Sequence, residues 1–288
     1  MTRISYLGPA GTFTEAALLA LNGAGRVPGA DLQPVPAEST PAALEAVRSG
    51  AADYACVPIE NSIEGGVTPT LDGLAVGSPL QIFAEIALDV TFSIVVAPGR
   101  GEAAIRTVAA HPVAGAQVRR WLTEHLPGAH TVPANSNAAA AQQVHDGEVD
   151  AGVSTALAAQ QRGLVALAEG VIDEANARTR FVLVGAPASP PARTGADRTS
   201  VVLRLDNAPG ALAAALAEFG SRSIDLTRIE SRPTRTELGT YLFFLDCIGH
   251  IDDEAVAEAL QALRRSCADV RYLGSWPIEP VGRCGVAS

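Results

Sequence analysis

The last third of the chain, residues 199–276, carries the pattern that most constrains the fold. Two runs, residues 224–231 and 240–248, alternate apolar and polar side chains, as strands buried on one face do. The remaining elements are two strands and two helices, predicted at residues 200–205, 270–273, 211–219 and 252–265. Taken in chain order they read βαββαβ, which predicts a ferredoxin-like sandwich with both helices on one face of a sheet.

The first 185 residues have a different organisation. Short strand patterns, such as those at residues 4–7 and 54–59, alternate with helical stretches of about a dozen residues, which indicates mixed α/β layers. A stretch rich in proline and glycine, residues 186–198, reads as a linker. The predicted organisation is therefore an α/β body over residues 1–185, a linker over 186–198, the βαββαβ unit over 199–276 and a tail over 277–288.

Composition and charge exclude several classes of function. The net charge of −10 argues against a nucleic-acid partner, since no basic patch offsets it. The strongest apolar stretch, residues 82–96, contains Glu85 and Asp89, so no membrane span is expected. The four cysteines have no paired spacing, and the chain opens directly into a strand without a leader pattern. We therefore expect a cytoplasmic protein with reduced thiols and no zinc site.

The motifs of phosphate-binding loops, dinucleotide folds, zinc proteases and hydrolase nucleophile elbows are missing from the sequence. The five histidines lie in predicted turns or on helix faces, and we interpret all of them as surface residues: His111, His125, His130, His145 and His250. The expected site therefore uses hydroxyl, amide and carboxylate groups, with no cofactor and no metal. Such a site suits a substrate that carries its own driving force.

Hydroxyl and amide residues begin four predicted helices. Thr12 and Glu15 have the spacing of a capping box, and Pro41 lies in the first turn of the next helix. The other candidate caps are Ser39 or Thr40, Ser136 or Asn137, and Ser154 or Thr155. Each is explained by ordinary capping, but several helix N-termini around one cleft would also bind carboxylates, because their free N–H groups carry partial positive charge.

A buried strand is predicted at residues 179–185, where Thr179 and Arg180 precede an apolar run. On a regular strand the side chains of Thr179 and Phe181 share one face and that of Arg180 takes the other. Phe181 is predicted to belong to the core.

Four segments, in this order, resemble the motifs of the prephenate dehydratase family. Residues 6–17 (YLGPAGTFTEAA) resemble the opening motif, residues 57–66 (VPIENSIEGG) the second, residues 136–140 (SNAAA) the third and residues 179–181 (TRF) the signature tripeptide. The segments PGAL and ESRP, which begin at residues 209 and 230, resemble the regulatory ACT domain attached to that enzyme. The resemblance extends from residue 3 to about residue 276.

The resemblance implies a two-lobed catalytic domain of the type II periplasmic-binding-protein kind, followed by the ACT domain. It also implies the reaction, in which prephenate loses carbon dioxide and water to give phenylpyruvate during L-phenylalanine biosynthesis. The implied catalytic residues are Thr179, which hydrogen-bonds the departing C4 hydroxyl, and Glu60, which supports it. Substrate-positioning roles are implied for Thr12, Asn61, Ser62, Ser136, Asn137 and Arg180, with Arg178 as the alternative to Arg180.

Regulation follows from the same resemblance. ACT domains pair side by side and bind an amino acid between two chains, which implies a homodimer or homotetramer inhibited by L-phenylalanine. The implied effector site comprises two segments: Asn207, Ala208, Pro209, Gly210, Ala211 and Leu212, and Glu230, Ser231 and Arg232. Two alternatives stay open, an arogenate dehydratase and a non-catalytic amino-acid-sensing binding protein.

Overall fold

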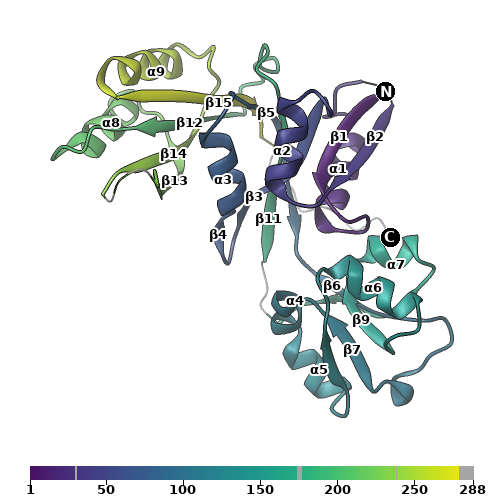
Figure 1. The fold of residues 1–288 in the computed structure, drawn as a ribbon. Coiled ribbons are helices and arrows are strands. Elements are labelled where there is room, and N and C mark those ends of the chain that lie inside the picture. Colours follow the sequence, from purple (N-terminus) through teal and green to yellow (C-terminus); the bar gives the residue numbers. More distant parts are fainter. Residues whose placement is uncertain (30, 174–176, 236, 238, 279–288) are drawn as a thin grey trace.

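The structure is a computed structural model that describes residues 1–29, 31–173, 177–235, 237 and 239–278. Three units follow one another in space: two α/β lobes and a C-terminal βαββαβ domain (Figure 1). The chain passes from the first lobe to the second between β5 and β6, and it returns between β10 and β11. This double crossing confirms the predicted two-lobed α/β fold.

Lobe 1 is built on a sheet of strand order β2-β1-β3-β11-β5, with the short β4 paired to β3. Strand β1 runs parallel to β2 and β3, whereas β11 runs antiparallel to both of its neighbours. The strands are β1 (Thr2–Leu7), β2 (Leu32–Ala37), β3 (Tyr54–Asn61), β4 (Gly65–Gly66), β5 (Gln81–Asp89) and β11 (Arg178–Gly185). The helices are α1 (Phe13–Gly23), α2 (Thr40–Arg48) and α3 (Thr68–Ala75).

The predicted helix starts of lobe 1 are confirmed, with one difference in detail. Thr12 accepts a hydrogen bond from the Glu15 amide, and Ser39 accepts one from the Ala42 amide. The Glu15 carboxylate reaches back to the amide of Gly11 rather than to that of Thr12, so the capping box is displaced by one residue. Helix α3 was not predicted, although a proline in its first turn and the spacing of Leu71 and Leu74 are helical signals.

Lobe 2 has the strand order β10-β6-β9-β7-β8, in which β7 is parallel to β8 and β9. Its strands are β6 (Phe92–Val96), β7 (Thr107–Ala110), β8 (His130–Pro133), β9 (Ala151–Ser154) and β10 (Val165–Val171). Its helices are a short 3-10 turn (Glu102–Ala104), α4 (Pro112–Gln117), α5 (Arg119–His125), α6 (Asn137–His145) and α7 (Ala156–Gln161). Helices α4 and α5 are separated at Val118, whose backbone leaves the helical region.

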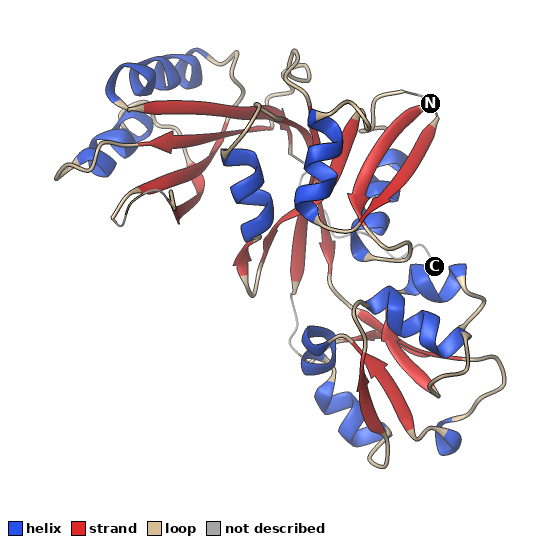
Figure 2. Ribbon diagram, in the orientation of Figure 1, coloured by secondary structure: helices blue, strands red, loops and turns tan. Residues whose placement is uncertain are grey.

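The C-terminal domain confirms the βαββαβ prediction. Its antiparallel sheet has the order β13-β14-β12-β15, and Figure 2 shows its two helices beside that sheet. The elements are β12 (Asp197–Arg204), α8 (Ala211–Gly220), β13 (Leu226–Pro233), β14 (Tyr241–Ile248), α9 (Glu254–Ser266) and β15 (Asp269–Pro277). Alternate residues of β14 pack on opposite sides, with Leu245 in the helix-covered core and Phe244 in a core that includes lobe 1.

Lobe 1 and the C-terminal domain thus share one hydrophobic core. Ile82, Val182 and Val184 of lobe 1 belong to the same buried cluster as Phe244 and Trp276. The backbones also approach closely where β15 crosses β5, because a Cβ atom added at Gly274 would lie 2.3 Å from the carbonyl oxygen of Ile82. Gly274 has φ +137°, a conformation that disfavours other residues, so this crossing requires glycine on two counts.

One histidine prediction is wrong. His250 is fully buried, whereas the other four are not. Its Nδ1 accepts a hydrogen bond from the amide of Asp252, so Nε2 carries the proton and donates to the carbonyl of Pro191 at 3.0 Å. The ring therefore fastens the proline-rich segment after lobe 1 to the C-terminal domain.

Among the described residues, Cys56, Cys247 and Cys267 are free thiols, and burial raises the pKa of Cys247 to about 12. Cys284 lies outside the described residues. In the described part of the chain, no cluster of residues suited to a metal ion was found, nor any helix long and apolar enough to cross a membrane.

Candidate active site

Thr179 and Asn61 form the centre of the candidate site. They face each other across the β11–β3 pairing, and the Asn61 side-chain amide donates to Thr179 Oγ1 at 2.9 Å. The amide orientation follows from its other contacts, since Asn61 Oδ1 accepts from the backbone amides of Ile63 and Glu64. Thr179 Oγ1 is therefore the acceptor in this bond, and its own O–H proton remains to be donated elsewhere.

Ser62 fixes the strand end that precedes Thr179. Its amide donates to the carbonyl of Arg178 at 2.8 Å, and its hydroxyl accepts from the Arg178 amide at 2.9 Å. Asn61 and Ser62 therefore hold both the loop after β3 and the backbone next to Thr179. Contact of Asn61 or Ser62 with substrate stays a prediction.

The structure places Glu60 and Arg180 differently from the sequence-based expectation. Arg180 Nη2 lies 3.0 Å from Glu60 and 2.6 Å from Asp246 of β14, and its side chain is only 10% exposed. Val182 and Val184, which follow Arg180 on alternate positions of β11, lie in the core shared with the C-terminal domain. Arg180 and Glu60 thus pair towards that domain, whereas Phe181 packs as predicted in the core beneath α1. Of the two arginines considered for substrate, Arg178 is the more exposed, and it pairs with Asp89 at 2.9 Å.

Ser136 and Asn137 lie in lobe 2, at the carboxyl end of β8. Ser136 caps α6 by accepting from the Ala139 amide at 3.0 Å, and the Asn137 carbonyl accepts from Ser154 Oγ at 2.6 Å. Asn137 Oδ1 is buried without a hydrogen-bond partner among the described residues. An orphaned acceptor of this kind at a helix start is available to a ligand.

Thr12 and the start of α1 meet lobe 2 directly. Thr155, the N-cap of α7, donates its hydroxyl to the carbonyl of Gly11 at 2.6 Å, and Gln161 donates to Glu15 at 3.1 Å. Phe13 contacts Phe92 edge-on, with ring centroids 5.7 Å apart. The carboxyl ends of β1 and β9 therefore face each other, which is where ligands of α/β sheets bind.

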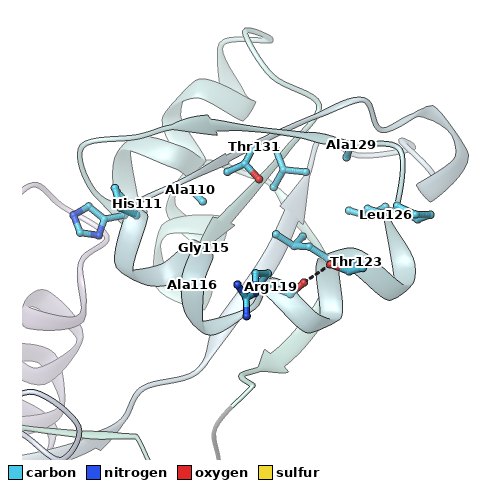
Figure 3. Close-up of a pocket in the computed structure, with 13 residues that line it drawn as sticks. Ala110, His111, Gly115, Ala116, Arg119, Thr123, Leu126, Ala129 and Thr131 are labelled. Atoms are coloured by element: carbon cyan, nitrogen blue, oxygen red, sulfur yellow. Dashed lines mark hydrogen bonds between the residues drawn. The ribbon is translucent and has the colours of Figure 1, made fainter.

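A separate groove of about 400 Å³ lies in lobe 2 between β7 and the helices α4 and α5 (Figure 3). Its lining includes Val108, Leu122, Leu126 and the cation Arg119. None of the residues predicted to catalyse or to bind substrate lines this groove, so it is not the candidate active site.

The C-terminal domain contains a smaller pocket of about 190 Å³ at the start of α8. Among its lining residues are four that were predicted to bind effector, Asn207, Ala208, Ala211 and Leu212, together with Tyr241 and Phe243 of β14. Pro209 and Gly210 belong to the same turn, and Gly210 begins α8 without a side-chain cap. The Ala211 amide donates to the carbonyl of Ala208, and the other amides of the first turn have no side-chain cap, beside the aromatic side chains of Tyr241 and Phe243.

The second predicted effector segment does not line this pocket within one chain. Glu230 and Arg232 lie on β13, where Glu230 pairs with Arg228 and Arg232 pairs with Asp72 of α3. Ser231 lies between them on the same strand.

Sequence reasoning missed the residues that join the three units. Asp246 lies at the centre of a buried set of charges, and Thr155 closes the contact between the lobes. The sequence presents Asp246 as one polar residue in an apolar strand, which is a usable signal for a buried ion pair.

The fold defines a class: a two-lobed α/β protein followed by a βαββαβ domain, with candidate polar residues in both lobes. Residues 4–189 match the prephenate dehydratase family, and residues 199–265 match the ACT domain. The prephenate dehydratase of Mycobacterium tuberculosis strain H37Rv is 72% identical over 283 residues, which cover 97% of this chain and 88% of the relative. The chain belongs to the prephenate dehydratase family.

Two solved structures show how closely the fold is shared. The prephenate dehydratase of Arthrobacter aurescens in complex with L-Phe has a TM-score of 0.87 and 46% identity, and the match covers 96% of this chain and 90% of that one. A quorum-quenching acylase has a TM-score of 0.84 and 31% identity, with coverage of 96% and 98%. This fold is therefore shared by a protein that is described as an acylase.

Proposed function

We propose that this chain converts prephenate to phenylpyruvate, carbon dioxide and water, with Thr179 as the group that assists departure of the C4 hydroxyl. The observation that carries the proposal is the 2.9 Å hydrogen bond from Asn61 to Thr179 Oγ1. Because Asn61 supplies a donor to that oxygen, the Thr179 proton points away from it and is available to the leaving hydroxyl. Asn61 is thus the positioning residue for Thr179.

The energetics of the reaction suit a site with few charges. Loss of carbon dioxide and hydroxide makes the substrate ring aromatic, so the main requirement is a hydrogen bond to developing negative charge on the leaving oxygen. A threonine hydroxyl is too weakly acidic for full proton transfer, so the oxygen leaves as hydroxide, hydrogen-bonded by Thr179, and takes up a proton from solvent after release. Glu60, which faces the C-terminal domain in an ion pair with Arg180, is better explained as part of the support of β11.

The two carboxylates of prephenate need donors, and helix starts supply them. We assign them to the first turns of α1 and α6, whose caps Thr12 and Ser136 lie in different lobes. The further polar groups that we consider for substrate are Asn137 Oδ1, which is buried without a partner among the described residues, and the exposed Arg178 side chain. A substrate held by both lobes would favour their closed arrangement.

For regulation, we propose that L-phenylalanine binds in the pocket at the start of α8 and inhibits. Its carboxylate would accept from the uncapped amides of α8, and its ring would lie against Tyr241 and Phe243. Since Glu230, Ser231 and Arg232 do not line this pocket within one chain, a second copy of the chain is the natural source of that segment. We therefore propose a homodimer or a homotetramer.

The proposed boundaries remain a catalytic domain over residues 1–185, a linker over 186–198, an ACT domain over 199–276 and a tail over 277–288, most of which lies outside the described residues. The cytoplasm is the proposed location, because free thiols such as Cys56 persist in reducing compartments.

The test is to mix the purified chain with prephenate at neutral pH and to follow phenylpyruvate by chromatography, with and without L-phenylalanine. Conversion that L-phenylalanine suppresses would support both proposals. Turnover of arogenate but not of prephenate would assign the chain to the amino analogue. If neither compound reacts while L-phenylalanine still binds, the chain is a sensor and the proposed activity is wrong.

A further inference from the structure

A cluster of charges, largely buried except for Glu60, lies where lobe 1 meets the C-terminal domain. We call it the interdomain charge cluster, and it comprises Glu60, Glu85, Arg180, Arg198, Arg228 and Asp246. Lobe 1 contributes Glu60, Glu85 and Arg180, and the C-terminal domain contributes the other three. Arg180 of lobe 1 pairs with Asp246 of the C-terminal domain, and Arg198 of that domain pairs with Glu85 of lobe 1. Each unit therefore supplies partners that the buried charges of the other unit need.

Arg180 is the member that connects the two units most directly. Its Nη2 lies 2.6 Å from Asp246 and 3.0 Å from Glu60, and its Nη1 lies 3.1 Å from Glu85. Burial by itself lowers the pKa of an arginine, but the three carboxylates outweigh burial and raise the pKa of Arg180 above its ordinary value. The guanidinium is therefore a permanent cation clamped between three strands.

Asp246 is the matching anion on the other side. It accepts from Ser200 Oγ at 2.7 Å and from Arg228 Nε at 3.0 Å, in addition to Arg180. Its side chain is 1% exposed. The bonds from Ser200 and Arg228 hold Asp246 within the C-terminal domain. A movement of that domain therefore shifts Asp246 against Arg180 of β11.

On the catalytic side, Arg180 directly follows Thr179 in β11. A displacement of the Arg180 side chain moves the backbone that carries Thr179, and hydrogen-bond assistance depends on geometry at a scale below 1 Å. The β11–β3 pairing has an irregularity between Arg180 and Phe181, whereas the β11–β5 pairing is regular there. The ion pairs of Arg180 add a constraint on the side of β3.

On the regulatory side, β14 runs from the effector pocket to the cluster. Tyr241 and Phe243 line the pocket, and Asp246 lies three residues further along the same strand. A ligand against these aromatic side chains therefore acts on the strand that holds Asp246.

We propose that Asp246 and Arg180 are positioning residues for Thr179, and that their ion pair transmits occupancy of the C-terminal pocket to the active site. The proposal rests on the proposed function, because it assigns a route to the inhibition described there. Docking alone does not explain the cluster, since the shared hydrophobic core already joins the two units and buried ion pairs are a poor source of stability.

The test compares Asp246→Asn and Ser200→Ala with the control Arg271→Gln. Asp246→Asn removes the charge with little change of shape, and Ser200→Ala, the milder variant, removes one hydrogen bond to Asp246. Arg271 also crosses the interface, donating to the carbonyls of Leu74 and Gly77, but it makes no contact with the cluster. The control therefore reports what weaker docking alone does.

The readouts are kcat and KM for prephenate without effector, L-phenylalanine binding by calorimetry, and the ratio of kcat/KM without and with saturating L-phenylalanine. We expect Asp246→Asn to lower kcat about tenfold with KM nearly unchanged, because a positioned group is displaced. L-Phenylalanine should still bind while the ratio falls towards 1, and Ser200→Ala should show a smaller change in the same direction. Arg271→Gln should keep kcat and the ratio within about twofold, the usual scatter for a peripheral substitution.

Asp246→Asn and Ser200→Ala with unchanged kcat and unchanged inhibition, whatever their melting temperatures, would show that the cluster only stabilises the interface, and the proposal would fall. Effects equal to those of Arg271→Gln would overturn it as well. If the wild-type chain does not convert prephenate, or converts it without inhibition by L-phenylalanine, the proposed function is what fails, and this route fails with it.

Discussion

Lobe 1 meets its two neighbours in very different ways. Towards the C-terminal domain it shares a hydrophobic core that contains Trp276 and Phe244, and a buried set of ion pairs. Towards lobe 2 its contacts include two hydrogen bonds from α7 and one aromatic pair, besides the two chain crossings. The first interface resembles the inside of a domain, whereas the second consists of contacts that can open and re-form.

This difference indicates where motion belongs. A packed core resists sliding, so lobe 1 and the C-terminal domain should move as one body. Hydrogen bonds at helix ends, next to chain crossings, suit hinge closure around a substrate. In our proposals the chemistry lies between lobe 1 and lobe 2, and the regulatory contact reaches it through β11 from the packed interface with the C-terminal domain.

The largest expected effect is on the chemistry proposed between lobe 1 and lobe 2. Thr179→Val keeps the shape of the side chain and removes its hydroxyl, so kcat should fall by about 10²–10⁴, the range for one positioned proton-donating group. Thr179→Ser, the matched control, should retain most of the activity. Steady-state kinetics with prephenate measure kcat for each variant. Near-normal turnover by the valine variant would show that a residue other than Thr179 assists the leaving hydroxyl.

The next effect concerns the packed interface between lobe 1 and the C-terminal domain. Trp276→Ala should lower the free energy of unfolding by about 3–5 kcal/mol, because a fully buried indole leaves a large cavity. Since lobe 1 and the C-terminal domain share this hydrophobic core, both should unfold together at a lower denaturant concentration than in the wild type. Denaturant titration followed by circular dichroism measures this, while the fluorescence of Trp121 in lobe 2 reports the remaining lobe.

Two separate transitions for lobe 1 and the C-terminal domain in the Trp276→Ala variant would contradict a shared core. Loss of lobe 2 structure at the same denaturant concentration would show that the two interfaces are more alike than their contacts indicate.

A smaller effect is expected at the contact between the lobes. Thr155→Val removes the hydrogen bond to Gly11 and the cap of α7, which should cost about 1–2 kcal/mol and raise KM for prephenate several-fold. Thr155→Ser keeps both hydrogen bonds and serves as the control. An unchanged KM with lowered stability would mean that this contact does not take part in closure.

The smallest effect is a pH dependence. Burial would raise the pKa of Asp246, but Arg180 and Arg228 outweigh burial and hold it below its usual range. A carboxyl with a depressed folded-state pKa stabilises the fold fully above its unfolded pKa, near 4, and loses that contribution as the pH falls towards its folded pKa. Between pH 5 and pH 3, unfolding free energies should therefore fall less steeply for Asp246→Asn than for the wild type.

The exposed pair Arg3–Asp53 gives the comparison for that titration. The hydrogen bonds from Arg3 also lower the pKa of Asp53, but both side chains are exposed to solvent. Asp53→Asn should therefore change the acid profile less than Asp246→Asn, and an equal change would argue that burial of the cluster is unimportant.

Much of the fold could be predicted from local patterns. The βαββαβ domain was found because its strands alternate regularly, and the starts of α1, α2, α6 and α7 were found because hydroxyl caps mark them. Helix α3 was missed because Val67 begins it without a side-chain cap, so that only its proline and leucine spacing signal it.

The site was predicted in part, for a physical reason. Thr179, Asn61 and Ser62 come together because they are neighbours in paired strands, which the motifs already suggest. The direction in which the Arg180 side chain points depends on Asp246, which lies 66 residues away in another domain. No local pattern shows how that domain docks. His250 was misjudged in the same way, since its partner is the carbonyl of Pro191 in a segment interpreted as a linker.

The close crossing at Gly274 has a consequence for exchanging regulatory domains between enzymes. A domain grafted onto lobe 1 must bring a residue without a Cβ atom to the point where β15 passes the Ile82 carbonyl. It must also present a carboxylate to Arg180 and an arginine to Glu85. A chimera that keeps only the linker length would join two surfaces that do not fit, so a working exchange has to carry β5 and β11 along with the domain they support.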